Sequence, residues 1–155
     1  MIFSTKAEYG VRLMVELGRH QGEGPVPLNA IAAGESLPLA YLERIAAQLR
    51  AAELVSSTRG AHGGYSLARP AEAITMDEVV QALEGAIVPM ECFTDDGVRR
   101  VLCSHERDSD SACATKLLWT RVQGGIVRAL QGTTLAELID FGAPDVPRPL
   151  VSGVA

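Results

Sequence analysis

Hydrophobic residues recur at helical spacing in six parts of the chain. In the third of these parts, Leu42, Ile45 and Leu49 fall on one face and form a continuous apolar stripe. The predicted helices cover residues 4–20, 28–35, 38–50, 74–84, 113–130 and 133–139. The pattern therefore predicts a protein that is mainly α-helical.

Two short stretches between the third and fourth helices have the character of β-strands. Residues 54–58 are rich in β-branched side chains, and residues 65–68 alternate like a half-buried strand. A basic, glycine-rich loop joins them. Because the two preceding helices form a helix-turn-helix, this ribbon predicts a winged helix, which presents one helix to the DNA major groove and the ribbon to the backbone.

The predicted fold class is mainly α with a small β-wing: a winged helix-turn-helix domain plus a long C-terminal dimerisation helix. The long helix carries more apolar surface than a small winged helix needs, and an antiparallel pair of copies would bury it, so we expect a twofold homodimer. The expected organisation is a DNA-binding domain over residues 1–84, a cysteine-bearing cluster loop over 85–112, the dimerisation helix and a short final helix over 113–141, and a flexible tail over 142–155.

Three local signals predict where helices begin and end. Thr5 and Glu8 match a capping box, in which the Glu8 carboxylate would accept a hydrogen bond from the Thr5 amide. Thr75 and Glu78 match a second box at the start of the fourth helix. Gly18 is expected to help end the first helix.

Charge is unevenly distributed along the chain. The net charge of −5 argues superficially against a nucleic-acid partner. However, residues 1–70 carry 7 Lys and Arg against 6 Asp and Glu, whereas residues 71–155 carry 7 against 13. The acidity therefore lies in the second half, and specific contacts together with dimerisation would have to compensate for a near-neutral DNA-binding half.

Composition and motifs exclude several classes of protein. The 155 residues are 47% hydrophobic and 21% charged, which is typical of a globular chain. No run approaches the length of a membrane span and no signal-peptide pattern is present, so we expect a cytoplasmic protein without a membrane partner. The absence of a Ser-His-Asp arrangement, a phosphate loop or an HExxH motif leaves little basis for an enzyme.

All three cysteines, Cys92, Cys103 and Cys113, fall in one polar segment that has little periodicity. Their spacing is not a metal-binding signature, and three isolated thiols are the simplest alternative. None of them lies on an apolar stripe, however, and a long structureless segment inside a compact chain is often functional. Thiolates there would suit an iron–sulfur cluster or zinc.

Three thiolates need a fourth donor, and two residues are candidates. His105 is two residues beyond Cys103, although a solvated loop histidine explains it equally well. Glu8 is distant in sequence, and the capping box is the simpler explanation for it. Lys116 cannot serve while it is protonated. The residues alone leave the fourth ligand open.

Five collinear motifs carry a resemblance to a known family. They are STKAEYGVR at residues 4–12, YLE at 41–43, LR at 49–50, LVSSTRGxxGGYxL at 54–67 and TLxEL at 134–138. Together they resemble the bacterial winged-helix regulator family that includes IscR and NsrR. The resemblance implies a homodimeric transcription regulator. It also implies that three cysteines between the fourth helix and the dimer helix hold an iron–sulfur cluster.

The resemblance also implies a DNA-binding set. By position, Tyr41 and Glu43 would read or brace the major groove, and Arg59 would enter the minor groove from the wing. Pro38 and Ala40 depart from the pattern, because IscR-like members carry serines there. The expected DNA-binding residues are Tyr41, Glu43, Arg44, Arg59, Gly60 and His62.

For the fourth ligand, the resemblance favours Glu8 over His105. IscR-like members place a histidine in C-x-x-H after the last cysteine, whereas this chain has Lys116 at that position. NsrR-like members use a carboxylate in the first helix, which Glu8 matches, and across a dimer Glu8 of one subunit could reach the other subunit's cysteines. The cofactor that we expect is a 4Fe-4S cluster, with 2Fe-2S as the alternative.

The sequence therefore predicts a homodimeric regulator, a repressor, that binds double-stranded operator DNA. An iron–sulfur cluster that senses redox state, nitric oxide or iron–sulfur supply would control its DNA affinity. The alternative is a zinc-bound or thiol-redox winged-helix regulator that uses the three cysteines and His105. A third hypothesis, motivated by the acidic charge and by Ala40, is an interaction scaffold or an enzyme whose winged helix no longer binds DNA.

Overall fold

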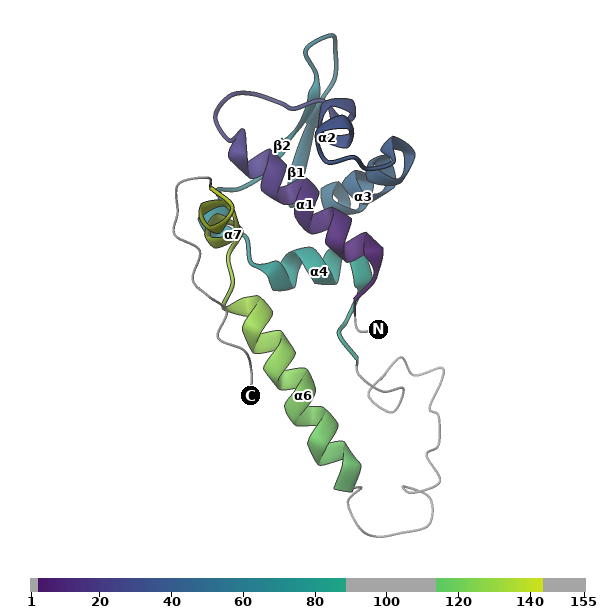
Figure 1. Cartoon of the computed structure of the whole chain (residues 1–155), viewed down its shortest axis with the longest axis vertical. Helices are drawn as coiled ribbons and strands as arrows, with labels where there is room; N and C mark the ends of the chain where they lie inside the picture. The colour runs from purple at the N-terminus through teal and green to yellow at the C-terminus, as the bar shows by residue number, and fades with distance from the viewer. Residues whose placement is uncertain (1–2, 89–113, 144–155) are drawn as a thin grey trace.

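The computed structural model describes residues 3–88 and 114–143. In these ranges the elements are α1 (Thr5–Arg19), α2 (Leu28–Gly34), α3 (Leu39–Ala51), β1 (Val55–Thr58), β2 (Gly64–Leu67), the 3-10 helix η1 (Ala71–Ala73), α4 (Met76–Glu84), α6 (Ala114–Gln131) and α7 (Leu135–Phe141). Figure 1 shows a head made of all these elements except α6, which extends away from it. The predicted mainly α fold with a small β-wing is confirmed.

The hydrophobic core lies in the head, around α1. This helix contacts α3, α4, α7 and β2. Burial of apolar side chains between these elements is the main favourable contribution to folding. The largest fully buried side chains are Leu13, Met14, Leu17, Leu42, Ile45, Leu49, Leu54, Ile74, Val79 and Leu135.

The helix-turn-helix is formed by α2 and α3. Ser36 lies between them with a φ of 54°, in the left-handed region, and turns the chain from one helix into the next. On α3, Leu42, Ile45 and Leu49 are each 0% exposed, as the predicted stripe requires. Burial of this stripe fixes the helix so that its opposite face lies in solvent.

The wing is an antiparallel ribbon anchored at its base. Strands β1 and β2 pair in a register that places Val55 opposite Leu67. Val26, in the extended piece before α2, forms a bridge with Tyr65, and each residue's amide lies 2.8 Å from the other's carbonyl oxygen. A Cβ at Gly64 would lie 2.4 Å from the Val26 carbonyl, so glycine is what allows the two backbones to approach.

Helices α4 and α7 begin side by side. Thr75 and Thr134 form an antiparallel bridge, and the Leu135 amide donates a hydrogen bond of 2.9 Å to the Ile74 carbonyl. Leu135 is 0% exposed, and α7 packs against α1 and η1. Although α7 follows α6 in the sequence, it is therefore part of the core of the head.

The helix caps match the sequence prediction at α4 but not at α1. Thr75 and Glu78 form the predicted capping box. At α1 the prediction was wrong, because Ser4 rather than the next residue is the N-cap. With Ser4 as the cap, the third helical residue is Ala7, which has no carboxylate to return to the cap. The Glu8 carboxylate is therefore not used in a capping box and interacts with other side chains.

Gly18 was also misassigned, because it lies inside α1, which ends at Arg19. A Cβ at Gly18 would lie 2.3 Å from the Cδ1 atom of Ile139 on α7. The glycine therefore serves the packing of two helices rather than the end of one.

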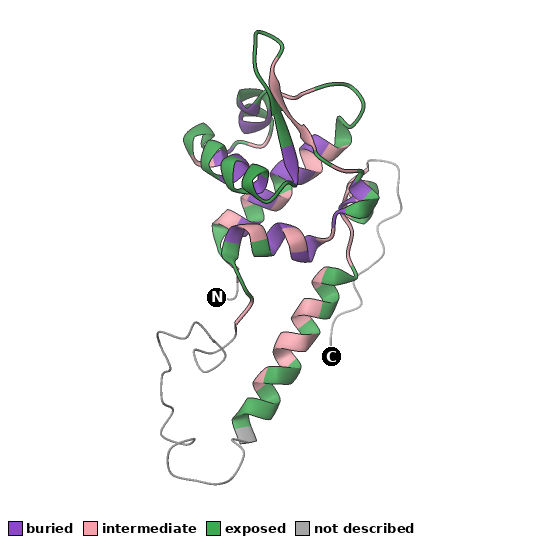
Figure 2. Ribbon diagram, turned by 180° about the vertical axis from the view of Figure 1, so that it is seen from behind, coloured by how far each residue is buried: buried purple, intermediate pink, exposed green. Residues whose placement is uncertain are grey.

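Helix α6 differs from the rest of the molecule. None of its residues from 115 to 131 is buried. Leu117 and Leu118 are 60% and 55% exposed, and Figure 2 shows no buried residue along the helix. It contacts the head through α4, and the Gln123 side chain donates a hydrogen bond of 2.7 Å to the Ile87 carbonyl. No helix in the described ranges combines the length and hydrophobicity that a membrane crossing requires.

Candidate nucleic-acid interface and metal ligand

The outer face of α3 carries three of the predicted DNA contacts. Glu43 and Arg44 are exposed. Tyr41 is half-buried, and its ring packs edge-on against Tyr9 of α1, with centroids 5.8 Å apart and planes at 81°. Such an aromatic pair favours one ring position, so α1 holds Tyr41 at the edge of the α3 surface.

The wing carries the other three predicted DNA contacts. Arg59, Gly60 and His62 are all exposed, and Gly60 has a φ of 116°, which favours glycine at that turn. At the base of the wing, the Arg50 guanidinium on α3 donates a hydrogen bond of 3.2 Å to the Ser57 hydroxyl on β1. The wing, α2 and α3 lie toward one end of the molecule, and the start of α6 lies toward the other (Figure 1).

Four of the five predicted metal ligands lie outside the described residues. They are Cys92, Cys103, Cys113 and the alternative ligand His105. Within residues 3–88 and 114–143, no group of three or more His, Cys, Asp or Glu side chains could hold a metal ion. Of the five candidate ligands, only Glu8 has a described position.

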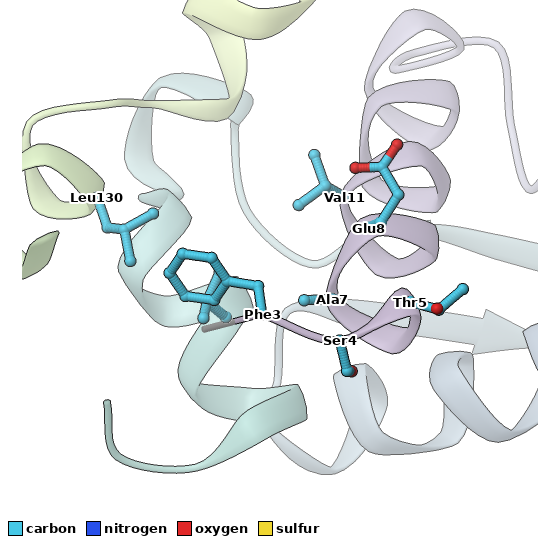
Figure 3. A pocket seen from close by; sticks show the side chains of 8 residues that line it. Phe3, Ser4, Thr5, Ala7, Glu8, Val11 and Leu130 are labelled. Carbon is cyan, nitrogen blue, oxygen red and sulfur yellow. The ribbon is translucent and has the colours of Figure 1, made fainter. Parts of the chain in front are cut away.

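Glu8 stands on the first turns of α1, beside a groove between that helix, α4 and α6. Its side chain is 65% exposed. The groove has a volume of about 470 Å³, and in Figure 3 the Phe3 ring lies between α1 and Leu130 of α6. The Ser4 hydroxyl donates a hydrogen bond to the Glu84 carboxylate at the end of α4. Residues 85–113, which contain the cysteines, follow directly in the sequence from that end.

Arg12 connects Glu8 to the helix-turn-helix. Its Nε atom lies 3.2 Å from a carboxylate oxygen of Glu8, one helical turn earlier on α1. Its Nη1 atom lies 3.7 Å from a carboxylate oxygen of Glu35, which ends α2. One guanidinium therefore stands between the candidate metal ligand and the turn that precedes α3.

A second ion pair links the end of the wing to α4. Arg69 donates a hydrogen bond of 2.7 Å to the Glu78 carboxylate. The hydrogen bond from the Thr75 backbone amide lowers the pKa of Glu78 below its usual range, against the effect of burial, and Arg69 lowers it further. Glu78 thus stabilises both the α4 cap and the segment between β2 and α4.

The roles of Arg12 and Glu35 were not predicted from the sequence, although Arg12 ends the first of the quoted motifs. The Glu8–Arg12 pair has a recognisable signal, because acidic and basic residues four positions apart share a helix face. The contact with Glu35 has none, because it depends on how α1 packs beside α2. Tyr9 was part of a motif, but its contact with Tyr41 likewise required the packing of two helices.

Known proteins resemble this chain over nearly its whole length. The model of the Rrf2 family, described as "Iron-dependent Transcriptional regulator", matches residues 3–141. The HTH-type transcriptional regulator CymR of Bacillus subtilis is 37% identical over 141 residues, which are 91% of this chain and 91% of that protein.

Two solved structures share the fold. That of CymR, the global cysteine regulator of B. subtilis, has a TM-score of 0.76 at 37% identity and covers 92% of this chain and 99% of its own. The structure of T. potens IscR has a TM-score of 0.74 at 33% identity and covers 96% of this chain and 94% of its own. The resemblance to the family that includes IscR is confirmed. This chain belongs to the Rrf2 family of transcriptional regulators.

Proposed function

We propose that this protein is a homodimeric repressor that binds operator DNA through α3 and the wing, and that an iron–sulfur cluster controls its DNA affinity. Cys92, Cys103 and Cys113 of one subunit and Glu8 of the other would hold the cluster. The position of Glu8 carries the proposal, because this exposed carboxylate lines the groove between α1, α4 and α6 and shares Arg12 with the helix-turn-helix.

The exposed chemistry of the head supports DNA binding. Arg44 on α3 and Arg59 on the wing provide cations for phosphates or base edges, and Tyr41 and Glu43 provide hydrogen-bonding groups on the same helix. A second helix of a helix-turn-helix enters the major groove, while a basic wing contacts the adjacent groove or backbone. The near-neutral charge of residues 1–70, which contain α2, α3 and the wing, implies that a twofold dimer supplies part of the affinity.

The exposed surface of α6 supports the dimer. Leu117 and Leu118 are 60% and 55% exposed, and burial of the exposed part of each would contribute about 1–2 kcal/mol. A second copy of α6, packed antiparallel around a twofold axis, is the simplest way to cover both.

Glu8 fits the chemistry of a labile fourth ligand. A carboxylate is a hard donor on thiolate-rich iron and is exchanged more easily than a thiolate, so the iron that it holds would be open to nitric oxide, oxygen or oxidants. The Glu8 carboxylate is exposed and is paired only with Arg12 among the ion pairs of the described residues, so it needs little rearrangement to bind elsewhere.

Arg12 supplies a route from the ligand to the DNA-binding surface. When the Glu8 carboxylate is engaged by a metal, Arg12 loses one of its two acidic partners, and its interaction with Glu35 changes. Glu35 borders the turn before α3, so a change there alters the placement of α3 in one of two dimer arrangements.

The experiment is anaerobic purification with visible absorption and counts of iron and sulfide. We expect a brown protein that becomes colourless when all three cysteines are replaced by alanine. Glu8→Ala should yield a cluster that is lost faster in air, whereas His105→Ala and the exposed control Glu72→Ala should behave as wild type. A colourless protein without iron would contradict the proposal, and a labile cluster in His105→Ala alone would reassign the ligand.

A thiol-based or zinc-based regulator is the second candidate. It is favoured by the similarity to a protein described as the global cysteine regulator of B. subtilis. Stoichiometric zinc, or reversible thiol oxidation that changes DNA affinity in metal-free protein, would select this candidate.

A further inference from the structure

The first turn of α3 presents an apolar side chain where a DNA-reading helix is expected to carry polar ones. Leu39, the first residue of α3, is 39% exposed, whereas Leu42 and Leu49 of the same helix are 0% exposed. Ala40 beside it is exposed as well. The core of the head therefore does not account for Leu39.

The proposed dimer does not explain the exposure of Leu39 either. The exposed leucines are near the start of α6, and Figure 1 shows that this end of the helix lies away from α2, α3 and the wing. A second copy that covers Leu117 and Leu118 would leave the start of α3 open. The surface that faces Leu39 in the proposed complex is the DNA major groove.

Only one group on the base edges of the major groove is apolar, the C5-methyl group of thymine. A leucine placed against cytosine would instead remove water from an amino group without offering it an acceptor, which is unfavourable. We propose that Leu39, supported by Ala40, is a specificity-determining residue that selects a thymine in each operator half-site through its methyl group. This inference rests on the proposed DNA-binding function of α3.

The spacing on the helix locates that thymine. Leu39 and Glu43 are four residues apart, so they share a face and are separated by about 6 Å along the helix axis. Successive bases on one strand are about 3.4 Å apart. The selected thymine therefore lies within about two base pairs of the base pair nearest to Glu43.

The test begins with operators selected from random-sequence DNA duplexes by the full-length protein. Each thymine of the selected half-site is then replaced by deoxyuridine, which removes the methyl group and leaves the Watson–Crick edge intact. We expect one position per half-site at which wild-type protein binds about fourfold more weakly, the effect of one methyl group leaving an apolar contact.

Variants assign that effect to Leu39. Leu39→Ala should bind the thymine and deoxyuridine duplexes equally, whereas Leu39→Met, which keeps an apolar side chain of similar size, should retain the difference. Phe141→Ala, which truncates another exposed apolar side chain on α7, should behave as wild type. An unchanged ratio in Leu39→Ala would overturn the inference.

The wild-type scan is decisive even if a variant fails to fold. If no thymine in the half-site is sensitive to loss of its methyl group, Leu39 does not act in this way, although the protein still binds DNA. If no duplex is selected at all, it is the proposed function that fails.

Discussion

The head and α6 bury their apolar residues in opposite ways. The head encloses ten large side chains at under 2% exposure, while α6 has no buried residue between positions 115 and 131. The two regions have similar helical patterns in the sequence, but within the described residues only the head encloses its apolar side chains in a core. We therefore expect the stability of the head to depend on its own core, and the leucines of α6 to be covered by a second copy as proposed above.

Core truncation should produce the largest effect and should separate the two regions. Leu42→Ala in the head should lower the free energy of unfolding by about 2–5 kcal/mol, because it leaves a cavity among fully buried neighbours. The same change at Leu118 should cost less than about 1 kcal/mol in dilute monomer. Denaturant titration followed by circular dichroism measures both. Equal losses would contradict the comparison.

Truncation of the α6 leucines should instead affect association. In the double variant Leu117→Ala and Leu118→Ala, four leucines are lost per dimer, so the dissociation constant should rise at least about a hundredfold. Sedimentation velocity over a concentration series measures this shift. Phe141→Ala, exposed but on α7, should leave association unchanged. A wild-type protein that stays monomeric would refute the role given to α6.

The joint between α4 and α7 should contribute an intermediate amount. Thr134→Ala removes the side-chain cap of α7 and should cost about 1 kcal/mol of stability. The matched control is Thr120→Ala, because that hydroxyl donates only to the Lys116 carbonyl within α6, and it should cost less than about 0.5 kcal/mol. If both variants are equally stable, α7 is not held as described.

Glu78 should give a small pH dependence. Because its pKa is lowered in the folded state, its stabilising contribution is fully present above the unfolded pKa of about 4.3 and is lost as the pH falls through the lowered value. The effect should be less than about 1 kcal/mol, since the side chain is 41% exposed and screened by solvent. Glu78→Gln should flatten this part of the stability profile, whereas Glu72→Gln should not.

Much of the fold could be predicted from the sequence because its determinants are local. The stripe of Leu42, Ile45 and Leu49 has the period of a helix. The capping box at Thr75 involves only the four residues from 75 to 78. The wing follows from β-branched residues on either side of a glycine-rich loop. These signals depend on residues that are close together in the sequence, so they can be recognised without knowledge of the tertiary structure.

The failures share a different cause. Gly18 looked like a helix end because its actual partner, Ile139, is more than a hundred residues away in the sequence. Ser4 and Thr5 both carry a hydroxyl group that can cap α1, and Ser4 is the N-cap in the structure. Glu8 is therefore not part of a capping box, and its carboxylate pairs with Arg12. The contact between Arg12 and Glu35 depends on how two helices pack, which periodicity does not specify.

The central claim is tested most directly by comparing operator affinity in cluster-loaded and cluster-free protein, for wild type, Glu8→Ala and the exposed control Glu72→Ala. We predict that the ratio of the two dissociation constants differs from one by at least about tenfold in wild type and in the control, a coupling of about 1.4 kcal/mol or more. In Glu8→Ala the ratio should be close to one. An unchanged ratio in Glu8→Ala, or a wild-type ratio of one, would contradict the claim that Glu8 links the cluster to the DNA-binding surface.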